Sequence, residues 1–251
     1  MRLALWQGPS PAGDRASALT TIRQTVQAAG AVGAATIVFP ETFLQGYNHA
    51  DIPEVAVSRV DPLMTELAEI CRNAGCGLVV GYAERDGNTV CNSAIAFDAD
   101  GQEVAHYRKI QLYGPREKAL YEPGSHYTVF DLEGQKAALL ICYDIEFAPH
   151  VAMLAARGVT LFLVPTANMQ PFTHVVRHTV PAMAANHGVS IVYANYCGSE
   201  GDLIYVGGSL IAGPHGEVLA QAGEGLAFLV ADIPEVDPAR ISTQAVDFRA
   251  I

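Results

Sequence analysis

The chain has 251 residues, of which 50% are hydrophobic and only 16% are charged, a composition typical of a globular protein with a large buried core. Its net charge of −11 argues against nucleic acid or an anionic membrane surface as a partner. No signal peptide is evident, no apolar run approaches the roughly 18 residues of a membrane span, and the five cysteines form no C-x-x-C pair, so we expect a cytoplasmic protein with reduced thiols.

The first third of the chain alternates short apolar runs with helical patterns, which is typical of α/β folds. Asp14 is the expected N-cap of a first helix, and a second helix is expected to begin at Asp61-Pro62. Cys71 belongs to the apolar stripe of the second helix and is therefore predicted to lie in the core. The strands predicted around these helices are residues 2–7, 36–39 and 77–82.

The middle of the chain, residues 91–129, is predicted to form successive strands joined by turns. A strand–helix–strand unit follows, and then a long helix and three further strands. The predicted ranges are strands 137–141, 159–164, 189–194, 208–212 and 226–232, with helices at 147–157 and 172–187. Neither a linker nor an internal repeat is visible, so we expect one domain over residues 1–251, built from two stacked sheets with helices outside.

Three chemically distinct side chains lie at predicted strand ends. Glu41 follows strand 36–39, Lys109 follows a strand that ends near residue 107, and Cys142 ends strand 137–141. Ligands of open α/β sheets bind at such ends. Because a free thiol is mostly protonated at neutral pH, a nucleophilic cysteine requires a neighbouring base or cation. Each residue alone is more typical of a surface or core position, but together they indicate a nucleophilic site.

The segments 39–47, 107–113 and 140–147 resemble, in order and spacing, the Glu-Lys-Cys triad motifs of the nitrilase (carbon–nitrogen hydrolase) superfamily. The resemblance extends to residues 3–7, 164–168, 193–195 and 208–216. It implies an α/β fold of the four-layer α-β-β-α sandwich type. It also implies a homodimer or higher homo-oligomer, with the unpatterned segment 238–251 as a candidate contact to the partner subunit.

The resemblance implies a role for each triad residue. Glu41 would be the general base, and Cys142 would attack the substrate carbon to give a thioester that water hydrolyses. Lys109 would stabilise the oxyanion together with the backbone N–H of Tyr143. No cofactor and no metal is required by this mechanism.

Further substrate-positioning residues are expected around the triad. The family has a second glutamate near the lysine, which Glu117 matches and Glu122 matches less well. The candidates for the pocket walls are Tyr47, Tyr113, Tyr143, Asn168 and Phe172.

The residues after Cys142 point to the substrate class. Tyr-Asp-Ile-Glu-Phe is similar to the aliphatic and stereoselective amidase branch, whereas Trp-Glu typically follows the cysteine in nitrilases. We therefore expect a small amide as substrate. The chain departs from that branch at Ala148-Pro149, and at Met183 and Asn186, where an arginine and a glutamate are lost together; we interpret the paired loss as a missing salt bridge.

Several alternatives stay open. The chain could be a nitrilase, or an N-carbamoyl amino acid hydrolase in which Arg177 or Arg116 binds the substrate carboxylate. It could also be a catalytically silent binding or assembly protein with the same fold. A papain-like Cys-His hydrolase is disfavoured because a strand precedes Cys142. A zinc site at His174 and His178 is disfavoured because a third ligand is absent from the motif.

Overall fold

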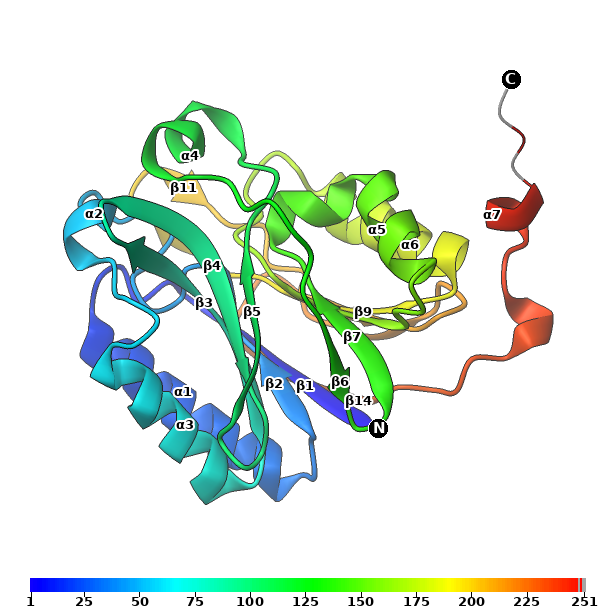
Figure 1. Cartoon of the computed structure of the whole chain (residues 1–251), viewed down its shortest axis with the longest axis horizontal. Helices are drawn as coiled ribbons and strands as arrows, with labels where there is room; N and C mark the ends of the chain where they lie inside the picture. Colours follow the sequence, from blue (N-terminus) through cyan, green and yellow to red (C-terminus); the bar gives the residue numbers. More distant parts are fainter. Residues whose placement is uncertain (248, 250–251) are drawn as a thin grey trace.

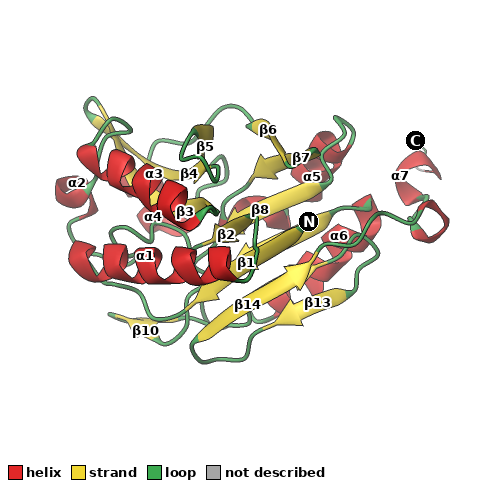
Figure 2. Cartoon of the chain, turned by 90° about the horizontal axis from the view of Figure 1, so that it is seen from below, coloured by secondary structure: helices red, strands yellow, loops and turns green. Residues whose placement is uncertain are grey.

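Two six-stranded β-sheets lie face to face in the computed structural model, which describes residues 1–247 and residue 249. Helices α1 and α3 cover the outer face of the first sheet, and α5 and α6 cover the outer face of the second (Figures 1 and 2). The predicted four-layer α-β-β-α sandwich is confirmed. The helices are α1 (Arg15–Ala31), α2 (Ile52–Val55), α3 (Pro62–Ala74), α4 (Gly114–Leu120), α5 (Ala148–Ala155), α6 (Val180–His187) and α7 (Gln244–Asp247).

Both sheets have the same pairing pattern: an antiparallel edge strand, three parallel strands and two further antiparallel strands. The first sheet runs β14 (Ala227–Asp232), β1 (Arg2–Gln7), β2 (Thr36–Val38), β3 (Gly77–Asp86), β4 (Thr89–Phe97) and β5 (Glu103–Arg108). The second runs β6 (Val129–Leu132), β7 (Gln135–Leu139), β8 (Leu161–Pro165), β9 (Ser190–Ala194), β12 (Leu210–Ala212) and β13 (Val218–Gln221). A small ribbon of β10 (Ser199–Glu200) and β11 (Leu203–Ile204) lies beside them.

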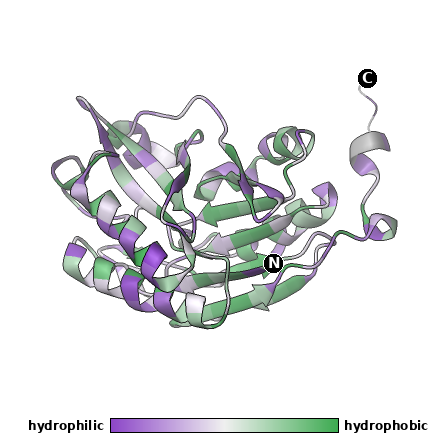
Figure 3. Cartoon of the chain, turned by 60° about the horizontal axis from the view of Figure 1, so that its bottom comes forward, coloured by the Kyte–Doolittle hydropathy of each residue, from purple (hydrophilic) through white to green (hydrophobic). Residues whose placement is uncertain are grey.

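Successive side chains of a strand point to opposite faces of its sheet, so the hydrophobic core has two layers: one between the sheets and one beneath the helices. In β1, Leu3 and Leu5 pack between the two sheets, whereas Ala4 and Trp6 pack beneath α1 and α3. Figure 3 shows the hydrophobic residues along the strands and hydrophilic residues on the outward side of these helices. Cys71 is fully buried in the layer beneath the helices, as predicted.

The predicted helix starts are present. The Asp14 side chain accepts a hydrogen bond from Ser17 N at 3.0 Å, and the Asp61 side chain accepts one from Leu63 N at 2.9 Å. Among the described helices, none is long and apolar enough to cross a bilayer.

Two parts of the chain differ from the sequence-based expectation. Residues 114–120 form helix α4 within a region predicted to contain only strands and turns. The predicted helix at 172–187 begins later, with a π-helical turn at Val175–Thr179 that leads into α6. The last described segment contains a 3₁₀ turn (Pro238–Arg240) and α7, and it extends along the outside of the sandwich (Figure 1). Its packing on a partner subunit stays a prediction.

The directions of the parallel strands determine where the candidate site residues lie. Glu41 follows β2, Cys142 follows β7, and Asn168 follows β8, all on loops at the carboxyl ends of parallel strands. The two sheets are joined at this end by a hydrogen bond from Glu41 N to Thr166 O of 3.3 Å. The stacking of the sheets therefore brings both halves of the chain to one site.

Candidate active site

Lys109 lies between two carboxylates. Its Nζ donates hydrogen bonds to Glu41 Oε1 at 2.6 Å and to Glu117 Oε1 at 2.7 Å, and all three side chains are fully buried. Lys109 follows β5, while Glu117 projects from α4. The helix that the sequence analysis missed therefore supplies the second predicted glutamate. Glu122 is exposed.

Polar groups from β4 and from two loops fix both carboxylates. Glu41 Oε1 also accepts a hydrogen bond from Asn92 Nδ2 at 2.7 Å. Glu117 accepts hydrogen bonds from the Tyr47 hydroxyl at 2.7 Å and from Tyr113 N at 2.8 Å. The second oxygen of Glu41, Oε2, is buried and has no hydrogen-bond partner among the described residues. This oxygen of the proposed base is thus free to accept a proton from another group.

Burial raises the pKa of Glu41 to about 7, against the opposing charge of Lys109 and with added repulsion from Glu117. Burial alone would lower the pKa of Lys109, but the charges of Glu117 and Glu41 outweigh it and raise that pKa well above its usual value. Lys109 is therefore a permanent cation, and Glu41 titrates near neutral pH. These are the properties of an electrophilic stabiliser and a general base, respectively.

Cys142 is the first residue of a 3₁₀ helix over Cys142–Glu146, at the sharp turn that follows β7. Its φ of 46° lies in the left-handed region, which is unusual for a residue other than glycine. Thr42, directly after Glu41, has the same φ of 46°. Both loops that carry the proposed base and nucleophile therefore contain a strained residue.

Asp144 holds the nucleophile turn in place. Its buried carboxylate accepts hydrogen bonds from Ile141 N at 3.0 Å, Gln111 N at 2.7 Å and the Tyr107 hydroxyl at 2.8 Å. These contacts connect the turn to β5 and to the loop that begins at Lys109. Tyr143 is the second residue of the 3₁₀ helix, where backbone N–H groups have no acceptor within the helix.

Burial raises the pKa of the Cys142 thiol well above its usual value, and the charge of Glu41 adds to this effect. Lys109 and hydrogen bonds from Thr166 and the Ala167 N–H act in the opposite direction without cancelling it. The thiol of the free protein is thus protonated at neutral pH, and its use as a nucleophile requires proton transfer to a base.

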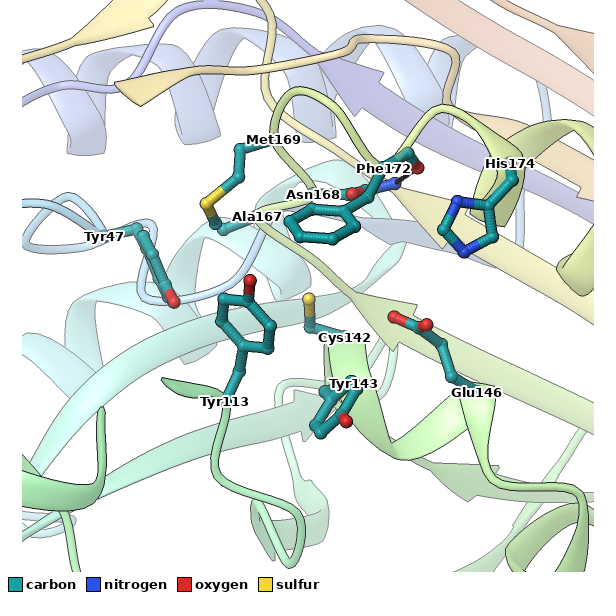
Figure 4. Close-up of a pocket in the computed structure, with 10 residues that line it drawn as sticks. All are labelled: Tyr47, Tyr113, Cys142, Tyr143, Glu146, Ala167, Asn168, Met169, Phe172 and His174. Carbon is teal, nitrogen blue, oxygen red and sulfur yellow. Dashed lines mark hydrogen bonds between the residues drawn. The ribbon is translucent and has the colours of Figure 1, made fainter. Parts of the chain in front are cut away.

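A cavity of about 220 Å³ opens onto Cys142. Its walls are largely aromatic, and Figure 4 shows the Cys142 sulfur pointing toward its centre. The lining residues are Tyr47, Tyr113, Cys142, Tyr143, Glu146, Ala167, Asn168, Met169, Phe172 and His174. All five side chains predicted for the walls are among them.

Some sequence-based candidates lie elsewhere. Arg116 donates hydrogen bonds to the backbone oxygens of Tyr47 and His49, and Arg177 is exposed on the π-helical turn. Neither arginine lines the cavity. The structure therefore provides no support for the N-carbamoyl amino acid hydrolase alternative that these arginines motivated.

Three supporting residues were not predicted from the sequence: Asn92, Asp144 and Asn195. Asn195 follows β9 and binds the Asn168 backbone in both directions, with Asn168 N to Oδ1 at 2.8 Å and Nδ2 to Asn168 O at 3.0 Å. A sequence signal exists for Asn92, because asparagine is depleted in buried strands and here interrupts one. The role of Asp144 was not predicted because two of its three partners, Gln111 N and the Tyr107 hydroxyl, are distant in the sequence.

Comparisons with known proteins agree with this geometry. The family model described as carbon-nitrogen hydrolase matches residues 2–241. A nitrilase of Pyrococcus abyssi is 35% identical over 79% of this chain and 76% of its own length. An (R)-stereoselective amidase of Pseudomonas sp. is 33% identical over 74% of this chain and 68% of its own length.

A solved structure extends the likeness to three dimensions. A cysteine-to-alanine mutant of the amidase from Nesterenkonia sp. AN1, in complex with butyramide, is 36% identical, has a TM-score of 0.90 and covers 99% of this chain and 94% of its own. Another mutant of that amidase shows Michael addition of acrylamide at the active site cysteine. The chain therefore belongs to the carbon–nitrogen hydrolase family, in its amidase-like branch.

Proposed function

We propose that the protein hydrolyses small amides to a carboxylic acid and ammonia, with Cys142 as nucleophile, Glu41 as general base and Lys109 as oxyanion stabiliser. The observation that carries this proposal is the buried Glu41–Lys109–Glu117 cluster, with bonds of 2.6 and 2.7 Å, next to a cysteine that opens into an aromatic cavity. The similar amidase that binds butyramide supports an aliphatic amide as substrate.

In the first half-reaction the Cys142 thiol proton moves to Glu41 as sulfur forms a bond to the amide carbon. The carbonyl electron pair moves to oxygen, and the resulting oxyanion is stabilised by Lys109 Nζ and the Tyr143 N–H. When this intermediate collapses, the C–N bond breaks and the nitrogen leaves as ammonia with the proton held by Glu41. A thioester remains on Cys142.

In the second half-reaction Glu41 takes a proton from water, and the resulting hydroxide attacks the thioester carbon. The C–S bond breaks, the acid leaves, and the proton returns to sulfur. Glu117 holds Lys109 in place through both steps and positions the substrate, while Tyr113 and Asn168 confine it as part of the cavity wall.

Nitrile hydrolysis is a second candidate because the Pyrococcus abyssi relative carries that name. The same triad would attack a nitrile carbon, so the two activities differ in the shape of the cavity and in how nitrogen leaves. The catalytically silent alternative predicts no turnover of either class.

The test is ammonia release from butyramide, butyronitrile and N-carbamoylglycine by the native protein and by Cys142→Ala. We expect release from butyramide by the native protein and none by Cys142→Ala. Cys71→Ala is the matched control, because Cys71 is a core thiol of α3, and it should retain release. Equal release by native protein and Cys142→Ala would refute the assignment, and preference for the nitrile would favour the second candidate.

We further propose a single domain over residues 1–251, a cytoplasmic location and a homodimeric or higher assembly. One hydrophobic cluster contains residues of both sheets, which supports a single folding unit. The free cysteines support a reducing compartment. The assembly rests on the family resemblance, and sedimentation velocity would test it.

A further inference from the structure

Glu146 brings a carboxylate into the cavity that the proposed mechanism does not use. The residue ends the 3₁₀ helix that Cys142 begins, and its half-buried side chain lines the cavity wall. Figure 4 shows its oxygens directed inward, with the His174 ring facing it from the opposite loop. Within residues 1–247, no hydrogen bond or ion pair joins this carboxylate to another side chain.

The charge around the cavity is negative. None of the described residues that line it is a lysine or an arginine. Lys109, the buried cation next to Cys142, is already shared between the carboxylates of Glu41 and Glu117. An acyl chain that ends in a carboxylate would therefore meet repulsion from Glu146 and no lysine or arginine in the cavity wall, whereas a cationic chain would meet the Glu146 carboxylate.

Aromatic rings stand next to this carboxylate. Tyr113 contacts Tyr143 and Phe172 edge to face, with ring centroids 5.4 and 5.8 Å apart. All three rings line the cavity together with Glu146 (Figure 4). Ring faces attract ammonium groups, and several rings around one carboxylate form a cage suited to a cation with attached methylene groups.

The burial of Glu146 has a cost that a bound cation would relieve. Burial raises the pKa of Glu146, and the charges of His174 and Lys109 oppose that rise only in part. A carboxylate withdrawn from water without a hydrogen-bond donor is less stable than one in water, so a donor brought by the substrate gains from the interaction.

We propose that Glu146 selects amides whose acyl chain carries a protonated amine, which lies between the Glu146 carboxylate and the aromatic rings, and that it excludes chains ending in a carboxylate. This inference rests on the proposed function, because it places the acyl group in the cavity above Cys142. It assigns a substrate class to the site in addition to a reaction.

The test compares two series of matched length: ω-amino amides with one to four methylene groups between the amine and the amide, and the n-alkanamides of equal size. Succinamate supplies the negatively charged chain. The quantity measured is the ratio of kcat/KM for the amino amide to that for the matched alkanamide, at the chain length where it is largest. Native protein, Glu146→Gln, Glu146→Lys and the control Glu69→Gln are compared. Glu69 is exposed on α3, so its substitution makes the same charge change away from the cavity.

We expect a ratio above one for the native protein and a decrease of about tenfold in Glu146→Gln, the effect of losing one hydrogen bond to a charged group. Glu146→Lys should reverse the preference and hydrolyse succinamate faster than the amino amides. Glu69→Gln should leave the ratio unchanged. A ratio that differs by less than about twofold between native protein and Glu146→Gln would overturn the inference, as would an equal change in Glu69→Gln.

Failure of this inference is distinguishable from failure of the proposed function. Alkanamide turnover that requires Cys142 but is insensitive to charge at residue 146 would overturn only the inference. Turnover that survives in Cys142→Ala would overturn the proposed function. If the native protein hydrolyses no member of the panel, calorimetric binding to Cys142→Ala decides: valeramide binding as tightly as 4-aminobutyramide would overturn the inference.

Discussion

Gly81→Ala tests whether the position of the Glu41 loop controls the chemistry. Gly81 lies in β3, where the loop after β2 crosses directly over it. A Cβ atom at Gly81 would lie 2.4 Å from Thr42 N and 2.7 Å from Glu41 Cα and from Pro40 O. Ordinary contact begins at 3.4 Å, so the loop that carries Glu41 must move by about 1 Å.

A displacement of this size predicts separate effects on activity and stability. Misplacing a catalytic group by about 1 Å costs on the order of a hundredfold in rate, so kcat for butyramide should fall by about that factor. Overpacking costs typically about 1–3 kcal/mol, which lowers Tm by roughly 2–12 °C in a chain of this size. The added methyl group touches neither the cavity nor the substrate, and KM should change far less than kcat.

The assay is steady-state ammonia release together with a thermal melt. Gly225→Ala is the matched control, because a Cβ atom there has no neighbour within 4 Å, and it should behave as the native protein. A folded Gly81→Ala protein with native kcat would refute the claim that the close approach of β3 positions Glu41.

Three further results follow from the ionised groups. Because Glu41 must be ionised to accept the thiol proton and burial raises its pKa in the free protein to about 7, kcat/KM should fall as pH falls through about 7; an acid limb near 4.5, the usual value for a glutamate, would contradict this in a pH–rate profile. Lys109→Met leaves two buried carboxylates without their cation and should lower the unfolding free energy by about 3–5 kcal/mol and the rate by a hundredfold or more. Adding Glu117→Gln should recover part of that stability in denaturant titrations but no activity. Asp144→Asn places an amide N–H against groups that donate hydrogen bonds to Asp144, so Tm and kcat should both fall in the assays used for Gly81→Ala. Native values of both quantities would show that the nucleophile turn does not depend on Asp144.

The sequence predicted the layers of the fold because periodicity reports burial directly. Strands such as residues 2–7 alternate between two apolar layers, and Asp14 and Asp61 mark helix starts by local chemistry. Helix α4 was missed because its seven residues carry little helical pattern; its buried Glu117 is held by Lys109 and by Tyr113 N. Tertiary contacts determine such a short element, and its own sequence does not reveal them.

The candidate site, like the fold, could be predicted from the sequence only in part. Glu41, Lys109 and Cys142 were predicted because each lies in a motif whose order matches a known family, and Glu117 because that family has a second glutamate near the lysine; the structure brings all four together. The matching pairing pattern of the two sheets was not predicted, because the sheets share it without a visible sequence repeat. Glu146 lies in segment 140–147, the motif of the nucleophile. Whether its carboxylate enters the cavity depends on the fold of the loop that faces it, and the sequence does not show this.

If the acyl group passes through a thioester on Cys142, hydroxylamine will intercept that thioester in competition with water. Butyramide and methyl butyrate are hydrolysed by the native protein at one fixed hydroxylamine concentration, and the ratio of hydroxamate to acid is measured for each. Both substrates form the same butyryl thioester after the leaving group has departed, so we expect the same ratio from both. A ratio that depends on the leaving group would rule out a common thioester on Cys142, because water would then attack the substrate directly.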